Sequence, residues 1–175
     1  MKGRERIAVV DHSAPKLSRS IPELPQQETV LVRLLRIAVY GMAGLFEGGL
    51  RSSGLAENQF NVLCFLLAAR NGRMSPSELS ELTGTSRPNI TRILRDLAEA
   101  GLIEMQDAER DGRRSVACIT EEGITRTRAA VPYMADPVAM AFAGLSEAEQ
   151  KTLDKLLRKL IVSIDESRHL QQSAA

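Results

Sequence analysis

Arginine, asparagine and hydroxyl side chains gather on one segment of the chain, where they can hydrogen-bond the edges of nucleic-acid bases. The segment is SRPNITRILRDLAEA, residues 86–100. In a helix that turns by about 100° per residue, its apolar and polar residues separate onto opposite sides. The apolar side holds Ile90, Ile93, Leu94 and Leu97, and the polar side holds Pro88, Asn89, Thr91, Arg92, Arg95 and Asp96, with Arg87 at the boundary. Arginine reads guanine edges with two hydrogen bonds and asparagine reads adenine, so the polar side suits contact with DNA. The alternative is an ordinary solvated face.

A second group of basic residues weighs against that alternative. Arg110, Arg113 and Arg114 lie within the polar stretch 107–114, and Asp111 precedes Arg113 by two residues. This stretch has the composition of a turn, and no fold needs three arginines there. Asp111 can pair with Arg113 and fix its direction. An arginine fixed at such a tip suits phosphates or a narrow minor groove.

The residues around these two groups predict the elements that position them. Ser75-Pro76-Ser77-Glu78 is typical of a helix start, because serine caps, proline suits the first position and glutamate completes a capping box. Thr83-Gly84-Thr85 predicts a turn into the helix over 86–100. Segments 102–106 and 115–119 alternate in polarity and predict the two strands of a hairpin. Two short helices followed by a hairpin make a winged helix-turn-helix.

Further helices are expected on both sides of this motif. Three-and-four spacing predicts one from about Glu28 to Arg51 and another from about Ala56 to Arg70, which Asn71-Gly72 would end with a glycine cap. A helix after Thr120 should be kinked or interrupted at Pro132 and Pro137. The last helix, after the capping box at Ser146, carries the apolar stripe Leu153, Leu156, Leu157, Leu160, Ile161 and Ile164. This stripe exceeds the needs of one surface helix, so we expect it to be buried against other helices or another subunit.

The first 27 residues are predicted to form a tail outside the folded part of the chain. Pro15, Pro22 and Pro25 lie at a spacing that breaks regular structure. The segment is expected to be either a disordered leader or an arm that wraps a partner subunit.

The composition limits the functions that fit. The chain has 175 residues, and its 23 basic and 22 acidic residues leave a net charge of +1, so an anionic partner must meet a local patch. Aromatic residues make up 3% and tryptophan is absent, which argues against the stacking platforms of single-strand binders. Hydrophobic residues make up 43%, which is enough for a folded core.

Catalytic and metal-binding patterns are not evident. The two histidines, His12 and His169, lie near opposite ends of the chain, and no phosphate loop or Ser/His/Asp set occurs. We therefore expect no enzyme, no metal and no cofactor. The first residues lack the apolar region of a signal peptide. The longest apolar run, Val62 to Ala69, is far short of the roughly 18 residues of a membrane span, so no membrane partner is expected.

The two cysteines leave two interpretations open. Cys64 and Cys118 each lie among apolar residues, which favours buried, reduced thiols in a cytoplasmic protein. The alternative is a redox-sensing regulator that uses one of them, which would require an exposed thiol of low pKa.

The segment SPSELSELTGTSRPNITRILRDLAEAGLIEMQDAERDGRRSVACITEEG resembles the MarR family of bacterial transcription regulators. The resemblance extends over about residues 28–165. Within the family, LPQQETVLVRLLR, the SRPN start and GLSEAEQKTLDKLLRKL resemble the EmrR/MprA-type regulators of multidrug efflux. Many members carry basic residues where this chain has Met105 and Gln106, so the resemblance does not carry that phosphate contact over to this chain.

The resemblance implies a mainly α fold with a small β-hairpin wing: a winged helix-turn-helix with a helical dimerisation region. The expected organisation is a tail or arm over 1–27, a first dimerisation helix over 28–55, a DNA-binding lobe over 56–120 and dimerisation helices over 121–168. The implied partners are a second copy of the chain and a palindromic double-stranded DNA operator. The candidate DNA contacts are Ser75, Ser86, Arg87, Pro88, Asn89, Thr91, Arg92, Arg95, Arg110, Asp111, Arg113 and Arg114.

The resemblance also implies a pocket for a small molecule between the dimer base and the DNA-binding lobe. A small aromatic or lipophilic effector bound there would release the DNA, so the implied function is that of a ligand-responsive repressor. Tyr40, Phe60 and Tyr133 are the aromatic candidates for the pocket walls, and plain core packing is their alternative role.

Overall fold

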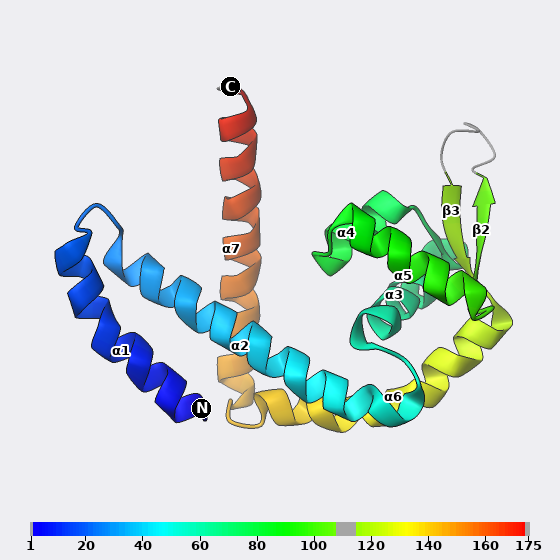
Figure 1. The fold of residues 1–175 in the computed structure, drawn as a ribbon, viewed down its shortest axis with the longest axis horizontal. Helices are drawn as coiled ribbons and strands as arrows, with labels where there is room; N and C mark the ends of the chain where they lie inside the picture. Colours follow the sequence, from blue (N-terminus) through cyan, green and yellow to red (C-terminus); the bar gives the residue numbers. More distant parts are fainter. Residues whose placement is uncertain (1, 108–114, 174–175) are drawn as a thin grey trace. The chain divides into compact units, whose positions relative to one another are not determined.

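The computed structural model describes residues 2–107 and 115–173, and these are mostly helical (Figure 1). The helices are α1 (Gly3–Ser20), α2 (Gln26–Leu50), α3 (Glu57–Ala68), α4 (Pro76–Thr83), α5 (Arg87–Glu99), α6 (Glu121–Phe142) and α7 (Glu147–Ser173), and the strands are β1 (Arg73–Met74), β2 (Ile103–Asp107) and β3 (Ser115–Ile119). The short 3-10 helices Arg51–Ser53 and Arg70–Gly72 follow α2 and α3. The chain forms two compact units, Met1–Ala135 and Asp136–Ala175. The expected mainly α fold with a small β element is confirmed.

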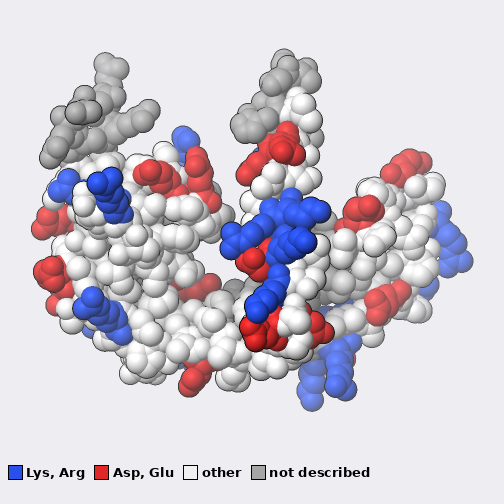
Figure 2. Space-filling view, turned by 180° about the vertical axis from the view of Figure 1, so that it is seen from behind, with Lys and Arg blue, Asp and Glu red and all other residues white. Residues whose placement is uncertain are grey.

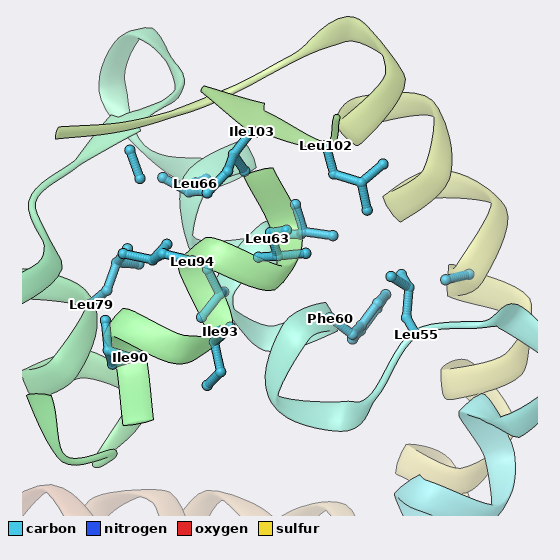
Figure 3. Close-up of a cluster of buried hydrophobic side chains, with 14 of the residues drawn as sticks. Leu55, Phe60, Leu63, Leu66, Leu79, Ile90, Ile93, Leu94, Leu102 and Ile103 are labelled. Atoms are coloured by element: carbon cyan, nitrogen blue, oxygen red, sulfur yellow. The ribbon is translucent and has the colours of Figure 1, made fainter. Parts of the chain in front are cut away.

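The core of the first unit lies between α3, α4, α5 and the sheet. Figure 3 shows Leu63, Leu66, Leu79 and Ile90 converging in it, and all four are fully buried. Because apolar residues at three-and-four spacing share one side of a helix, α3 and α5 each supply one side of this core. Burial of these side chains from three helices, α3, α4 and α5, fixes α5 against the rest of the lobe.

The sheet has three antiparallel strands in the order β1-β3-β2. Ile103 pairs with Ile119 and Asp107 with Ser115, as expected for the hairpin. The two-residue strand β1 was not expected, because it is too short to show alternating polarity. It forms because α3 ends at Ala68, and Asn71 and Gly72 then take left-handed backbone conformations (φ 62° and 64°). Asn71-Gly72 is therefore a turn into β1, and the glycine cap expected directly after the helix is wrong.

The irregular structure expected for the first residues is wrong for Gly3–Ser20, which form α1. Pro15 lies inside this helix. α1 packs on α2, where Val10 is buried and the Arg33 guanidinium donates to the Ser13 hydroxyl at 2.9 Å. Packing on α2 stabilises the helix despite the lost backbone hydrogen bond at the proline.

The helices α6 and α7 differ from expectation in one respect. α6 is a single helix from Glu121 to Phe142 that continues through Pro132 and Pro137. The expected interruption is therefore wrong, and the alternative, a kink, stays a prediction. The start of α7 has the expected capping box: the backbone N–H and the hydroxyl of Ser146 both donate to Glu149, at 2.8 and 2.7 Å. Within its own unit α7 leaves its apolar stripe largely uncovered.

α2 is also strongly apolar. The segment Gln26–Ser53 has a mean hydropathy of 1.6 in its most apolar window, and by length and composition alone it could cross a membrane. The sequence expectation considered only unbroken apolar runs and therefore missed this segment. Helices from the core of soluble proteins pass the same test.

Candidate nucleic-acid interface

The first helix of the helix-turn-helix, α4, begins with the predicted capping box. The Glu78 backbone N–H donates to the Ser75 hydroxyl oxygen at 3.2 Å, and Glu78 accepts from the Ser75 backbone N–H and hydroxyl at 2.8 and 2.7 Å. These two hydrogen bonds lower the pKa of Glu78. Ser75, a predicted DNA contact, thus holds the helix start with its side chain.

The turn between α4 and α5 is closed by local hydrogen bonds. Gly84 ends α4 in the left-handed region (φ 64°), a conformation that costs glycine least. The Thr85 N–H donates to the Ser80 carbonyl at 3.2 Å, and the Ser80 hydroxyl donates back to the Thr85 carbonyl at 2.6 Å. This reciprocal pair sets the direction in which α5 leaves the turn.

α5 separates its two sides as the sequence predicted. Ile90, Ile93, Leu94 and Leu97 are buried. The predicted contacts on the other side face solvent or are half-buried: Ser86, Arg87, Pro88, Asn89, Thr91, Arg92 and Arg95. Ser86 takes the N-cap position without a capping bond from its side chain in the described structure, so its hydroxyl is available.

The polar side of α5 is internally connected. Arg92 donates from Nη2 to Asn89 Oδ1 at 2.9 Å and from Nη1 to Asp96 Oδ2 at 3.2 Å. Arg95 lies 3.8 Å from Asp96 and 3.9 Å from Glu99. The Thr91 hydroxyl donates to the Arg87 carbonyl at 3.0 Å. The hydrogen bonds that join Asn89, Arg92 and Asp96 were not predicted from the sequence, although spacings of three and four residues in a helix would have pointed to them.

The wing is positioned by the loop before β2 and the start of α6. The Thr120 hydroxyl donates to the Gly101 carbonyl at 2.8 Å and accepts from the Gly123 N–H at 3.0 Å. A Cβ at position 123 would overlap the backbone oxygen of Leu102, so α6 and this loop lie as close as backbones can. Arg110, Asp111, Arg113 and Arg114 lie outside the described residues. Met105 and Gln106 lie on β2, and Gln106 donates to Glu104 at 3.4 Å.

Charge of both signs is distributed over the molecule. Figure 2 shows basic and acidic side chains interspersed on the face in view, in keeping with the net charge of +1. No general electrostatic attraction of the whole chain can therefore hold DNA, and binding must come from local groups.

The three aromatic candidates occupy different surroundings. Phe60 is buried in the core of the lobe. Tyr40 on α2 is 74% exposed, with the Arg6 guanidinium 5.7 Å from its ring centroid, and Tyr133 on α6 is also exposed. A cavity of about 400 Å³ lies between the end of α2 and the start of α3, and its lining includes none of them. Its walls include Glu47, Arg51 and Glu57, and burial raises the pKa of Glu57. No sequence pattern indicated these cavity residues.

Neither thiol has the surroundings of a reactive cysteine. Burial raises the pKa of the Cys64 thiol, which lowers the fraction of reactive thiolate. Cys118 is buried on β3. These surroundings weigh against the redox alternative.

Comparison with known proteins decides the family. The MarR family model matches residues 53–114. The transcriptional repressor MprA of Escherichia coli strain K12 is 31% identical over 147 residues, which cover 82% of each chain. The chain belongs to the MarR family. It is thus a transcription regulator of a DNA-binding family rather than an enzyme, and its relatives include the MprA type that the sequence resembled.

Solved structures agree with the fold of this MarR-family chain. Sco3205 of Streptomyces coelicolor, a MarR-family regulator solved in complex with DNA, has a TM-score of 0.72 at 23% identity, covering 81% of this chain and 93% of its own. BpsR of Bordetella bronchiseptica, whose DNA binding is regulated by 6-hydroxynicotinic acid, has a TM-score of 0.67 at 25% identity, covering 74% and 97%.

Proposed function

We propose that this MarR-family regulator is a cytoplasmic repressor that binds a palindromic operator as a homodimer and is released by a small molecule. The observation that carries the proposal is the outer side of α5. Its apolar side is buried in the lobe, while its N-terminal half presents Arg87, Asn89 and Arg92 outward. The N-terminal part of a recognition helix is the part that reaches base edges in the major groove.

The remaining DNA contacts would hold the helix in place. Ser86, Thr91 and Arg95 lie along the same side of α5 and are suited to phosphates. Arg110, Arg113 and Arg114, oriented in part by Asp111, would reach the flanking phosphates or minor groove from the wing.

Uncovered apolar residues support a homodimer. On α7, Leu156, Leu160, Ile161 and Ile164 are exposed, and Leu153 and Leu157 are half-buried. α2 exposes a further apolar set, Leu31, Val32, Leu35 and Val39. Apolar surface of this extent in a folded chain is typical of an interface between subunits.

A small aromatic or lipophilic effector is the proposed release signal. The support is the regulated DNA binding of BpsR and the cavity between α2 and α3. Tyr40, Phe60 and Tyr133 remain candidates for contact with the effector, because a ligand can draw in side chains that a free chain keeps apart.

A footprint tests the proposal. The purified protein is incubated with the DNA upstream of its own gene, with and without phenolic or uncoupler-like compounds. We expect a two-fold symmetric protected site that weakens with an effector, while random DNA of equal length gives no footprint. Protection by a monomer, or uniform protection of any sequence, would contradict the proposal.

A further inference from the structure

A second cavity, of about 230 Å³, lies in the first unit where four segments of the chain meet. Its walls come from the loop between α2 and α3, from α3, from the last turn of α5 with the loop that follows it, and from the start of α6. Leu55 also lines the larger cavity between α2 and α3, but the other lining residues differ. Pockets for drug-sized ligands hold roughly 300–1,000 Å³, so an occupant of this cavity would be smaller.

The walls combine apolar side chains with two charged ones. Leu55, Leu97 and Leu102 are buried residues of the core, and Figure 3 shows Leu55 and Leu102 on the side of the core next to α6. Glu122 and Arg126, both on α6 and both exposed, supply the charges. Apolar walls with a few polar groups are the usual form of a small-molecule site.

Glu122 and Arg126 line the cavity without pairing with each other. Residues of opposite charge four positions apart in a helix commonly form an ion pair, as Asp154 and Arg158 do in α7 at 2.9 Å. The Arg126 guanidinium lies instead against the loop between α2 and α3, where a Cβ on Gly54 would be 2.8 Å from Nη2. Within the part of the chain that the structure describes, neither Glu122 nor Arg126 takes part in an ion pair. A positive and a negative group are thus both available to a ligand.

The two charges favour an occupant that carries both signs. A simple anion attracted by Arg126 would also meet the negative charge of Glu122, and a simple cation would meet the reverse. A molecule with one charge of each sign gives both groups a charge-assisted hydrogen bond. The rest of the molecule should be apolar, because the three leucine side chains offer no hydrogen-bonding group and gain from apolar contact.

We propose that this cavity binds an α-amino acid with an apolar side chain. Arg126 donates to the carboxylate, Glu122 accepts from the ammonium group, and the side chain lies among the three leucines. The Gln59 amide oxygen accepts from the Ala56 N–H at 3.0 Å, and the Gln59 amide N–H groups are further donors for the carboxylate. Side chains four residues apart on a helix have Cβ atoms about 5–6 Å apart, a span that one small zwitterion can bridge.

Three ligands of related shape test which groups are recognised. L-leucine carries both charges, 4-methylpentanoate lacks the ammonium group, and 3-methylbutylamine lacks the carboxylate. Calorimetric titration of the full chain, without DNA, should give one bound leucine per chain and at least about tenfold weaker binding of each analogue. Equal affinity for leucine and either analogue would overturn the zwitterion assignment. Absence of binding by leucine, methionine and phenylalanine alike would overturn the site.

Substitutions on α6 locate the site. Arg126→Gln should weaken leucine binding about tenfold or more, whereas Arg128→Gln removes the same charge from an exposed position outside the cavity walls and should leave binding unchanged. Glu122→Gln should weaken the binding of leucine but not of 4-methylpentanoate, and Glu121→Gln is its matched control. Equal effects of the cavity variants and their controls, in proteins that circular dichroism shows to be folded, would overturn the location.

The outcomes also separate this site from the proposed function. The titrations contain no DNA, so they depend neither on an operator nor on contacts of α5 with bases. If leucine binds and no footprint is found, the amino-acid site stands and the proposed repressor fails. If a footprint forms and weakens with a phenolic compound but no amino acid binds, the repressor stands and the amino-acid site is wrong.

Discussion

Arg92 and Arg113 are expected to carry different parts of the binding energy. Base contacts discriminate between sequences, whereas phosphate contacts strengthen binding to any sequence. Arg92→Ala should therefore reduce the difference in binding free energy between operator and random DNA by about 1–3 kcal/mol. Arg113→Ala, in the wing, should weaken binding to operator and random DNA more evenly, and it should reduce the dependence of the binding constant on salt concentration. Titrations at two salt concentrations on both duplexes measure the difference.

A third variant, Asp111→Ala, tests whether Asp111 orients Arg113. Removing an acidic residue should tighten binding to DNA if the wing is only a diffuse basic patch. If Asp111 instead orients Arg113, its loss should partly reproduce Arg113→Ala despite the gain in positive charge. Tighter binding by Asp111→Ala in the same titrations would show that the pairing argument is wrong.

The cysteines are expected to contribute to packing rather than to sensing. Burial raises the pKa of Cys64, and Cys118 lies buried on β3. Mild peroxide should leave operator affinity unchanged, and Cys64→Ser with Cys118→Ser should reduce the free energy of unfolding but preserve regulation. Loss of binding on oxidation, restored by a thiol reductant, would instead support a redox switch.

At the scale of the element, the start of α4 should make stability depend on pH. Hydrogen bonds from Ser75 lower the pKa of Glu78 in the folded chain. A carboxyl group with a lowered folded pKa stabilises the fold above its unfolded pKa, and this contribution is lost as the pH falls through the folded value. The difference in unfolding free energy between wild type and Glu78→Gln should therefore be full at pH 7 and should begin to shrink only as the pH falls below about 4.3, the ordinary pKa of an unfolded glutamate. Ser75→Ala should cost about 1 kcal/mol at pH 7. A constant difference between wild type and Glu78→Gln across this range would refute the assignment.

The contact between α6 and the loop before β2 leaves no room for a side chain at position 123. An added Cβ would overlap the Leu102 backbone oxygen and lie 2.9 Å from Cγ1 of Ile119. Gly123→Ala should therefore lower the free energy of unfolding by about 1–3 kcal/mol. Gly41→Ala in α2, where an added Cβ meets nothing within 4 Å, should be neutral or stabilising by about 0.5–1 kcal/mol. Equal effects of the two in thermal unfolding would contradict the steric explanation.

The sequence predicted the helix-turn-helix because its signals are local. The Ser75 capping box, Gly84 and the apolar spacing of α5 each act within a few residues. β1 was missed because two residues cannot show a period, and its strand pairing with β3 is set by residues more than forty positions away. α1 was missed because Pro15 argues against a helix locally, while the contacts that stabilise it come from α2. The outer residues of α5 were predicted individually, but not the hydrogen bonds that link Asn89, Arg92 and Asp96.

For the whole molecule, the expected assembly state depends on the apolar stripe of α7. Leu157→Asp would place an unpaired charge in a buried interface, which is costly, so the variant should dissociate or unfold. Lys155→Asp, at an exposed position of the same helix, is the matched control and should remain dimeric. Light scattering at micromolar concentration distinguishes the two. A folded wild-type monomer under these conditions would exclude the proposed dimer.

The exposed stripe on α7 has a further consequence for the proposed dimer, which concerns protein abundance. If two chains must dimerise before either can bind an operator, the concentration of the active dimer grows with the square of the monomer concentration when the protein is scarce. Occupancy of the promoter would then rise steeply above a threshold number of molecules per cell. Growth and division dilute the protein, so a cell that falls below this threshold would express the regulated genes even without an effector. The hydrophobicity of the α7 stripe would in this way set the copy number at which repression begins.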